Sequence, residues 1–145
     1  MRRFVSVALL ALVFAPSLGA QAARTYRTRL APVPVPAFSP TIVGSGSLTA
    51  TLTGTKLAIA GTFDKLNTPA TVARVHKSPK PGIRGPVLFE LTVSKGTSGS
   101  ISGNIDLSPA QVQELEQGRY YVQRHSEKAP DGNLWGWLMA PKGRR

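Results

Sequence analysis

The chain of 145 residues contains two histidines, and each ends a segment whose residues alternate as in a β-strand. His76 ends residues 71–76, and His125 ends residues 119–125. An imidazole ring can donate or accept a hydrogen bond, change its charge near neutral pH, or bind a transition metal. The two histidines are therefore the first candidates for a functional site.

Successive side chains of a strand point to opposite faces, which assigns the neighbours of each histidine to a side. Arg74 shares the face of His76, whereas Ala73 and Val75 are expected to face the core. The second strand divides in the same way, with Tyr121, Gln123 and His125 on one face and Tyr120, Val122 and Arg124 on the other.

A copper or zinc site formed by His76 and His125 is one interpretation, if the two strands are neighbours. Two neutral nitrogens are fewer than the three protein ligands of a typical catalytic zinc site, although Asp131 would add a carboxylate. The cationic Arg74 opposes a metal ion beside His76. We favour histidines that hydrogen-bond to loop backbone, and we assign neither a metal nor another cofactor.

Trp135 and Trp137 share one face of the expected last strand, and Arg74 would lie over an indole if these strands are close. Aromatic rings dominate core burial, so the favoured expectation is that both tryptophans fill core volume. The alternative is an exposed pair that stacks on a sugar or another flat ligand. The candidate ligand-binding set joins this pair to the histidine face and consists of Arg74, His76, Tyr121, His125, Trp135 and Trp137.

The loop after His76 is the most cationic of the chain. Gly82, Gly85 and Pro86 serve its tight turns. Its basic side chains can contact phosphate or carboxylate groups without reading a sequence. We therefore expect three residues to steer an anionic partner toward the candidate face, namely Lys77, Lys80 and Arg84.

The elements that position these residues are mainly short strands. Residues 48–53 and 57–63 alternate apolar and small polar side chains around Gly54-Thr55, which predicts a β-hairpin. Ser108, Pro109 and Gln111 predict the start of a short helix that ends before Gly118. Further strands are expected over 71–76, 86–93, 98–107, 119–125 and 133–139. The predicted fold is an all-β, antiparallel two-sheet β-sandwich of about seven strands with one short helix, and a small β-barrel is the alternative.

The layout of these motifs resembles the CHRD domain, first described in chordin, and in particular bacterial exported proteins that carry one. That family's pattern is roughly an HxH strand, a G-x-x-G-P-V loop and strand, a G-x-x-Y-V-x-x-H strand and then G-E-x-R-G, and it is followed here over about residues 44–140. The resemblance implies a β-sandwich and a binding or structural role. The chain departs from it at Arg74, where the family commonly has histidine, and at Asn133 and Trp135, which replace an acidic residue and an arginine.

The N-terminal residues have the features of an export signal. Met1-Arg2-Arg3 is basic, residues 4–14 are apolar, and Ala20-Gln21-Ala22 is a small-x-small cleavage site. We expect a signal peptide over 1–22, a proline-rich linker over 23–44 that is extended rather than part of a sheet, a CHRD-like domain over 45–140 and a basic tail over 141–145. This predicts a periplasmic or extracellular protein whose mature chain has no transmembrane anchor.

Composition narrows the chemistry further. The chain has no cysteine, which excludes disulfides and thiolate catalysis, and its formal net charge is +11. Removal of Arg2 and Arg3 with the signal peptide leaves sixteen basic and seven acidic residues, a charge of +9. The acidic residues are scattered, and no nucleophile motif, P-loop or HExxH is present.

The sequence therefore favours a non-catalytic binding or structural module whose partner is an unknown protein or an anionic envelope polymer. It gives no indication of sequence-specific nucleic-acid recognition. Two alternatives remain open, a copper- or zinc-binding protein that uses His76 and His125, and a nonspecific polyanion binder driven by net charge.

Overall fold

The computed structural model describes residue 19 and residues 21–141. Most of the expected signal peptide and the end of the basic tail lie outside the described residues. Within the described residues, eight strands and one helix, α1 (Pro109–Glu116), follow one another. The strands are β1 (Arg24–Pro32), β2 (Ser45–Thr53), β3 (Lys56–Asp64), β4 (Ala70–Lys77), β5 (Val87–Val93), β6 (Gly99–Asp106), β7 (Tyr120–Ser126) and β8 (Ala129–Trp137).

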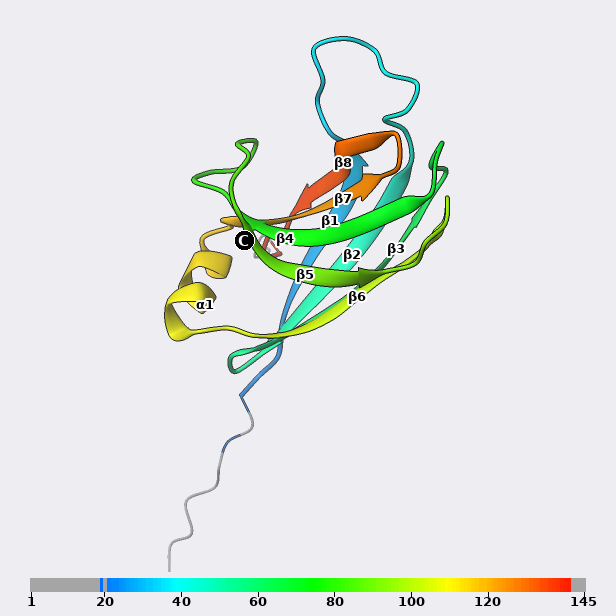
Figure 1. Ribbon diagram of the computed structural model, residues 1–145. Helices are drawn as coiled ribbons and strands as arrows, with labels where there is room; N and C mark the ends of the chain where they lie inside the picture. The colour runs from blue at the N-terminus through cyan, green and yellow to red at the C-terminus, as the bar shows by residue number, and fades with distance from the viewer. Residues whose placement is uncertain (1–18, 20, 142–145) are drawn as a thin grey trace, which may run out of the picture.

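The strands form a closed, antiparallel barrel in the order β1-β2-β3-β6-β5-β4-β7-β8, and β1 returns to β8 to close it (Figure 1). The all-β prediction is confirmed, but the two-sheet sandwich is wrong and its alternative, a small barrel, describes the fold. The physical reason is β1, which pairs with β2 along most of its length and with β8 through Ala31 and Pro32. Without this strand, β2 and β8 would each have a free edge.

The expected linker over 23–44 is wrong in its first part, because Arg24–Pro32 is a strand of the barrel. Tyr26 and Leu30 point inward and are buried, while Arg27 and Arg29 point outward. This alternation is typical of a half-buried strand. The prolines that indicated an extended linker begin only at Pro32, the last residue of β1, so their effect on the backbone falls on the β1–β2 loop.

The interior of the barrel is apolar along most of its length. The predicted hairpin is confirmed as β2 and β3, whose turn contains Gly54 with a φ of 63°. Leu52 and Leu57, opposite each other at its closed end, are buried in the same cluster as Tyr120 and Val122 from β7. Ala73 and Val75 also face this core, as the alternation predicted.

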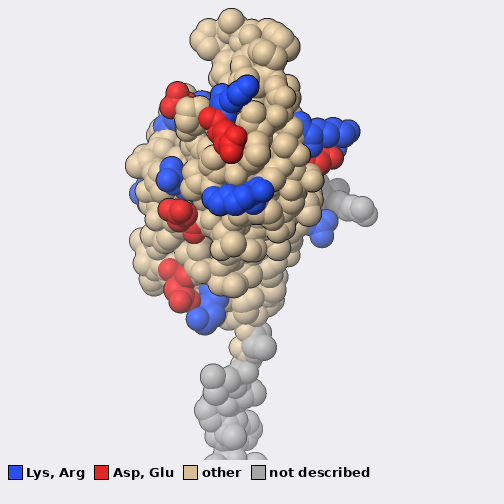
Figure 2. Space-filling view, turned by 45° about the vertical axis from the view of Figure 1, so that its right-hand side comes forward, with Lys and Arg blue, Asp and Glu red and all other residues tan. Residues whose placement is uncertain are grey.

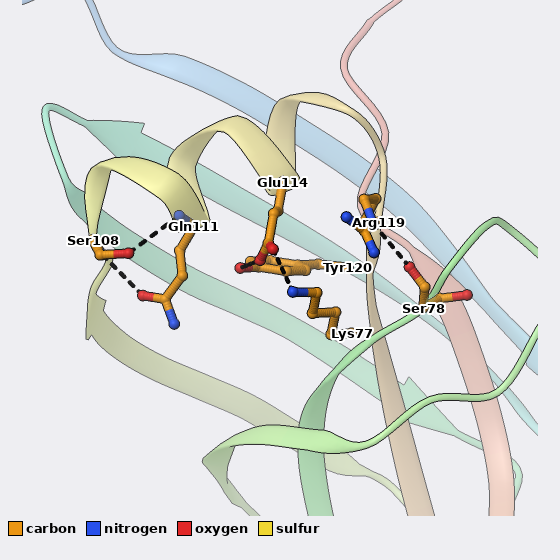
Figure 3. Close-up of polar contacts among 7 residues, drawn as sticks. All are labelled: Lys77, Ser78, Ser108, Gln111, Glu114, Arg119 and Tyr120. Atoms are coloured by element: carbon orange, nitrogen blue, oxygen red, sulfur yellow. Dashed lines mark hydrogen bonds and ion pairs between the residues drawn. The ribbon is translucent and has the colours of Figure 1, made fainter.

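Helix α1 closes one end of the barrel and begins with the N-terminal capping residues that the sequence predicted. The Ser108 hydroxyl accepts a hydrogen bond from the Gln111 backbone amide, and the Gln111 side-chain oxygen accepts one from the Ser108 backbone amide (Figure 3). Glu114 then attaches the helix to two strands, because it forms an ion pair with Lys77 and accepts a 2.8 Å hydrogen bond from the Tyr120 hydroxyl. No helix among residue 19 and residues 21–141 is long and apolar enough to cross a membrane.

Candidate binding face

The barrel brings the candidate residues together on the outer face of three adjacent strands. β7 lies between β4 and β8, and Tyr121 is opposite both His76 on β4 and Trp137 on β8. One step along, Gln123 is opposite both Arg74 and Trp135. We call this set the β4–β7–β8 face, and it comprises Arg74, His76, Tyr121, Gln123, His125, Trp135 and Trp137.

Four aromatic rings of this face form a continuous stack. The Tyr121 ring lies between His76 and Trp137, with centroid separations of 4.9 Å and 4.7 Å and interplanar angles of 18° and 27°. Trp135 meets Tyr121 and Trp137 edge-on, at 5.9 Å and 4.7 Å. Offset and edge-to-face pairs are the favoured arrangements of aromatic rings. Each ring therefore limits the movement of the next, and the face is preorganised.

The loop from Ser78 to Pro86 covers one side of the stack. The Gly85 carbonyl lies 2.9 Å from His76 Nδ1, and the Gly85 amide donates a 3.0 Å hydrogen bond to the Tyr121 hydroxyl. Only glycine fits at this position, because a Cβ atom would lie 1.7 Å from the Lys77 carbonyl oxygen. Arg84 extends from the same loop over Trp135, with 5.7 Å between Cζ and the ring centroid, and donates a 2.7 Å hydrogen bond to the Asp131 carbonyl.

Both histidines are held by backbone carbonyls, as the favoured interpretation expected. His76 Nδ1 is 2.9 Å from the Gly85 oxygen, and His125 Nδ1 is 2.7 Å from the Pro130 oxygen. A carbonyl accepts only, so each Nδ1 carries the proton and each Nε2 keeps a lone pair in the neutral ring. Nε2 of His76 is buried and has no hydrogen-bond partner among the described residues.

Burial and nearby cations keep the two imidazoles neutral. Desolvation lowers the pKa of His76 and of His125 more than the carbonyl hydrogen bonds raise them. The charges of Arg74 and Arg84 lower both pKa values further, and His76 adds to the effect on His125. The face therefore presents neutral imidazoles next to permanently cationic guanidinium groups.

Exposure divides the face into a contact surface and a support beneath it. His76, Tyr121, Gln123 and His125 are buried, with exposed fractions of 7%, 1%, 3% and 6%. Arg74, Trp135 and Trp137 are partly exposed. The expectation that both tryptophans fill the core is wrong, because Leu134 of β8 and Leu138, the residue after it, belong to the core cluster, whereas the indoles point outward. Their partners on β7 are Gln123 and Tyr121, which belong to the outer face.

The three predicted steering residues differ in their surroundings. Lys77 is engaged with Glu114 and helps to hold α1, so its charge is already neutralised. Arg84 lies at the edge of the aromatic stack. Lys80 is exposed on the loop, whose turn is organised around the buried Ser78 hydroxyl. The cation over an indole is therefore Arg84, and not Arg74 as the sequence suggested.

Two residues of functional interest were not singled out by the sequence. Gln123 lies between the histidine and tryptophan sides, with its Nε2 3.4 Å from His125 Nε2 and 3.1 Å from the Asp131 carbonyl. Its Oε1 is buried without a partner among the described residues. Arg124, on the opposite face of β7, is buried inside the barrel. Strand alternation assigned both to a face, but which of their polar atoms are left without a partner depends on long-range packing.

Within residue 19 and residues 21–141, no group of three or more His, Cys, Asp or Glu side chains is placed to hold a metal ion. Asp131, the suggested third ligand, contributes its backbone carbonyl to Arg84 and Gln123. The groups of the face that could ligate a metal ion are thus two imidazoles and one side-chain amide, and two guanidinium charges lie beside them.

The closed barrel defines the chain as an all-β domain, and its aromatic face with a cationic rim is a candidate binding surface. The family model of the CHRD domain matches residues 27–138, which is most of the chain, and the chain belongs to the CHRD domain family. The match begins within β1, earlier than the sequence resemblance suggested. Comparisons with curated proteins and with solved structures found no match.

Proposed function

We propose that this protein is an exported, non-catalytic binding module that holds an anionic envelope polymer on the β4–β7–β8 face. The observation that carries the proposal is the partly exposed Trp135–Trp137 pair, supported from below by Tyr121 and edged by Arg74 and Arg84. Flat sugar rings stack on indoles, and guanidinium groups bind carboxylates in a bidentate manner. A polymer of acidic sugars offers both features in each repeat.

The proposal is tested with a polyuronate such as alginate, measured beside neutral dextran at low and at physiological salt. Trp135→Ala and Trp137→Ala should each weaken alginate binding about three- to tenfold, which corresponds to the loss of one aromatic contact. Ala60→Ser, on the exposed face of β3, is the matched control. Unchanged binding in both tryptophan variants, with the fold intact by thermal melting, would reject this face.

The nonspecific alternative makes a different prediction in the same assay. If net charge alone drives binding, affinity falls steeply with salt and does not depend on either tryptophan. If the face is specific, part of the affinity survives physiological salt, because stacking is not screened. The salt series therefore separates the two functions without a further variant.

A copper or zinc site remains the second candidate function, and one observation favours it. The Nδ1 atoms of His76 and His125 are fixed by carbonyls, an arrangement that commonly orients metal-binding histidines by leaving Nε2 available. Arg74 and Arg84 oppose it. Elemental analysis of untagged protein tests the idea, and stoichiometric metal that is lost in His76→Gln would replace the polymer proposal.

A further inference from the structure

The β1–β2 loop is a largely exposed segment without a charged side chain. Residues 31–44 contain no charged side chain, although the sequence as a whole has a net charge of +11. Phe38 is 90% exposed and Val35 is 41% exposed. The loop projects well beyond the barrel in Figure 1 and forms the uncharged knob at the top of Figure 2. A projecting, uncharged tip with an exposed phenylalanine is unusual for a surface that faces only water.

The base of the loop is fixed to the barrel, so the tip is held outward. Asn133 is buried, and its side-chain Nδ2 donates a 3.0 Å hydrogen bond to the Thr41 carbonyl. The backbone carbonyl of Asn133 accepts a 3.0 Å hydrogen bond from the Val33 amide. Val33 is buried. The alternating prolines Pro32, Pro34 and Pro36 restrict the rising arm of the loop to extended conformations. The exposure of Phe38 is therefore a consequence of a constrained backbone.

Basic side chains accompany the loop at this end of the barrel. The antiparallel order places the β1–β2, β3–β4, β5–β6 and β7–β8 connections at the same end. Lys65, Lys95 and Lys128 each belong to one of the other three connections, and none of them forms an ion pair among the described residues. Asp64 and Glu127 lie at this end too, so the local excess of positive charge is small and the net charge of the chain adds to it.

We propose that the β1–β2 loop (residues 33–44) inserts Phe38 into the interface of an anionic lipid bilayer, with Lys65, Lys95 and Lys128 facing the headgroups. Aromatic and aliphatic side chains gain free energy at the boundary between headgroups and acyl chains, and basic residues near the surface add electrostatic attraction to anionic lipids. A planar bilayer accepts a convex tip without a complementary groove. The β4–β7–β8 face lies on the barrel wall, so this inference is independent of the proposed polymer site.

The absence of cysteine from the sequence permits a site-specific test on the full chain. A polarity-sensitive fluorophore is attached at Phe38→Cys, and the label is observed with vesicles of phosphatidylcholine, with and without phosphatidylglycerol. Ile83→Cys is the matched control, because Ile83 is also exposed and lies between Lys80 and Arg84, on the β4–β5 connection at the other end of the barrel. The apolar residues 4–14 are the same in both proteins and cancel in the comparison.

The expected result is a blue shift at position 38 that requires phosphatidylglycerol, with none at position 83. Unlabelled Phe38→Ser should partition into the anionic vesicles at least about tenfold less than the parent chain, because the transfer of a phenyl ring out of water is worth that factor or more. No shift at position 38, or equal shifts at both positions, would overturn the proposal. So would a parent chain whose self-association, measured by light scattering, is lost in Phe38→Ser while vesicle binding is unchanged, because the loop would then be a contact between copies.

Discussion

Arg124 is a cation inside the barrel without a carboxylate partner, and its replacement by methionine should stabilise the protein. The residue is 0% exposed. Its Cζ lies 4.5 Å from the centroid of the Phe63 ring, and its Nη2 is 3.4 Å from Asn133 Oδ1. Nε and Nη1 are buried without hydrogen-bond partners among the described residues, and no ion pair there includes Arg124. Buried charges usually require such partners.

The size of the effect follows from the pKa of the buried group. Burial lowers the pKa of Arg124 from its usual range to about 10, so the guanidinium remains charged at pH 7. A pKa change of this size means that burial of the charged guanidinium destabilises the folded state by about 3 kcal/mol. The cation–π contact with Phe63 offsets about 1–2 kcal/mol of this. We therefore expect Arg124→Met to raise the free energy of unfolding by about 1–2 kcal/mol at pH 7.

Urea titration and thermal melting at pH 7 measure this difference, and Arg124→Lys is the matched control. Lysine keeps the buried charge but loses the planar contact with Phe63, so this variant should be less stable than the parent. The methionine variant should melt a few degrees higher. If Arg124→Met is destabilised as much as Arg124→Lys, packing of the side chain outweighs the buried charge, and the reasoning is refuted.

Three further predictions concern the groups that hold the helix and the binding face. Glu114→Gln should lower the free energy of unfolding by about 1–2 kcal/mol at pH 7, because the ion pair with Lys77 lowers the pKa of this carboxyl. The difference from the parent protein should disappear as the pH falls through that lowered pKa. The melting temperature should be steady above about pH 6.5 and decrease below it, because the pKa values of His76 and His125 are lowered in the folded state and the unfolded chain therefore binds protons more readily. The double variant His76→Gln, His125→Gln should have a melting temperature that depends less on pH across this range. An equal slope in both proteins would contradict the assignment. Gly85→Ala should destabilise by about 2 kcal/mol or more and weaken alginate binding, as followed by melting and titration, whereas an unaffected variant would show that the loop backbone can move.

Local patterns predicted most strands and the helix correctly. The alternation from Leu48 to Phe63 and the capping residues Ser108 and Gln111 depend on neighbours in sequence, and both were confirmed. The closure of the barrel depends on β1, where the nearby prolines outweighed the weaker alternation of Tyr26 and Leu30. Closure is a long-range property, since Ala31 pairs with Trp135 about a hundred residues later.

Six of the seven residues of the β4–β7–β8 face were candidates from the sequence, whereas Gln123 was not, and the arrangement of the face was not predicted. Alternation correctly assigned Arg74, His76 and Tyr121 to faces of their strands. It did not show that β7 separates β4 from β8, and this order decides which cation reaches which ring. Because Gln123 lies between Arg74 and Trp135, the indole is approached instead by Arg84 from the loop.

The departures from the family pattern have different consequences on the two sides of the barrel wall. On the outer side, Trp135 replaces an arginine of the pattern, while Arg84 places a guanidinium over its ring, so a cation is retained beside an added aromatic surface. Near the interior, Asn133 replaces an acidic residue and leaves Arg124 with a neutral partner at 3.4 Å. The outer change adds partly exposed aromatic surface, whereas we expect the inner one to lower stability. Stability and binding should therefore respond to separate substitutions, and Arg124→Met should leave alginate affinity unchanged because its side chain faces away from the β4–β7–β8 face.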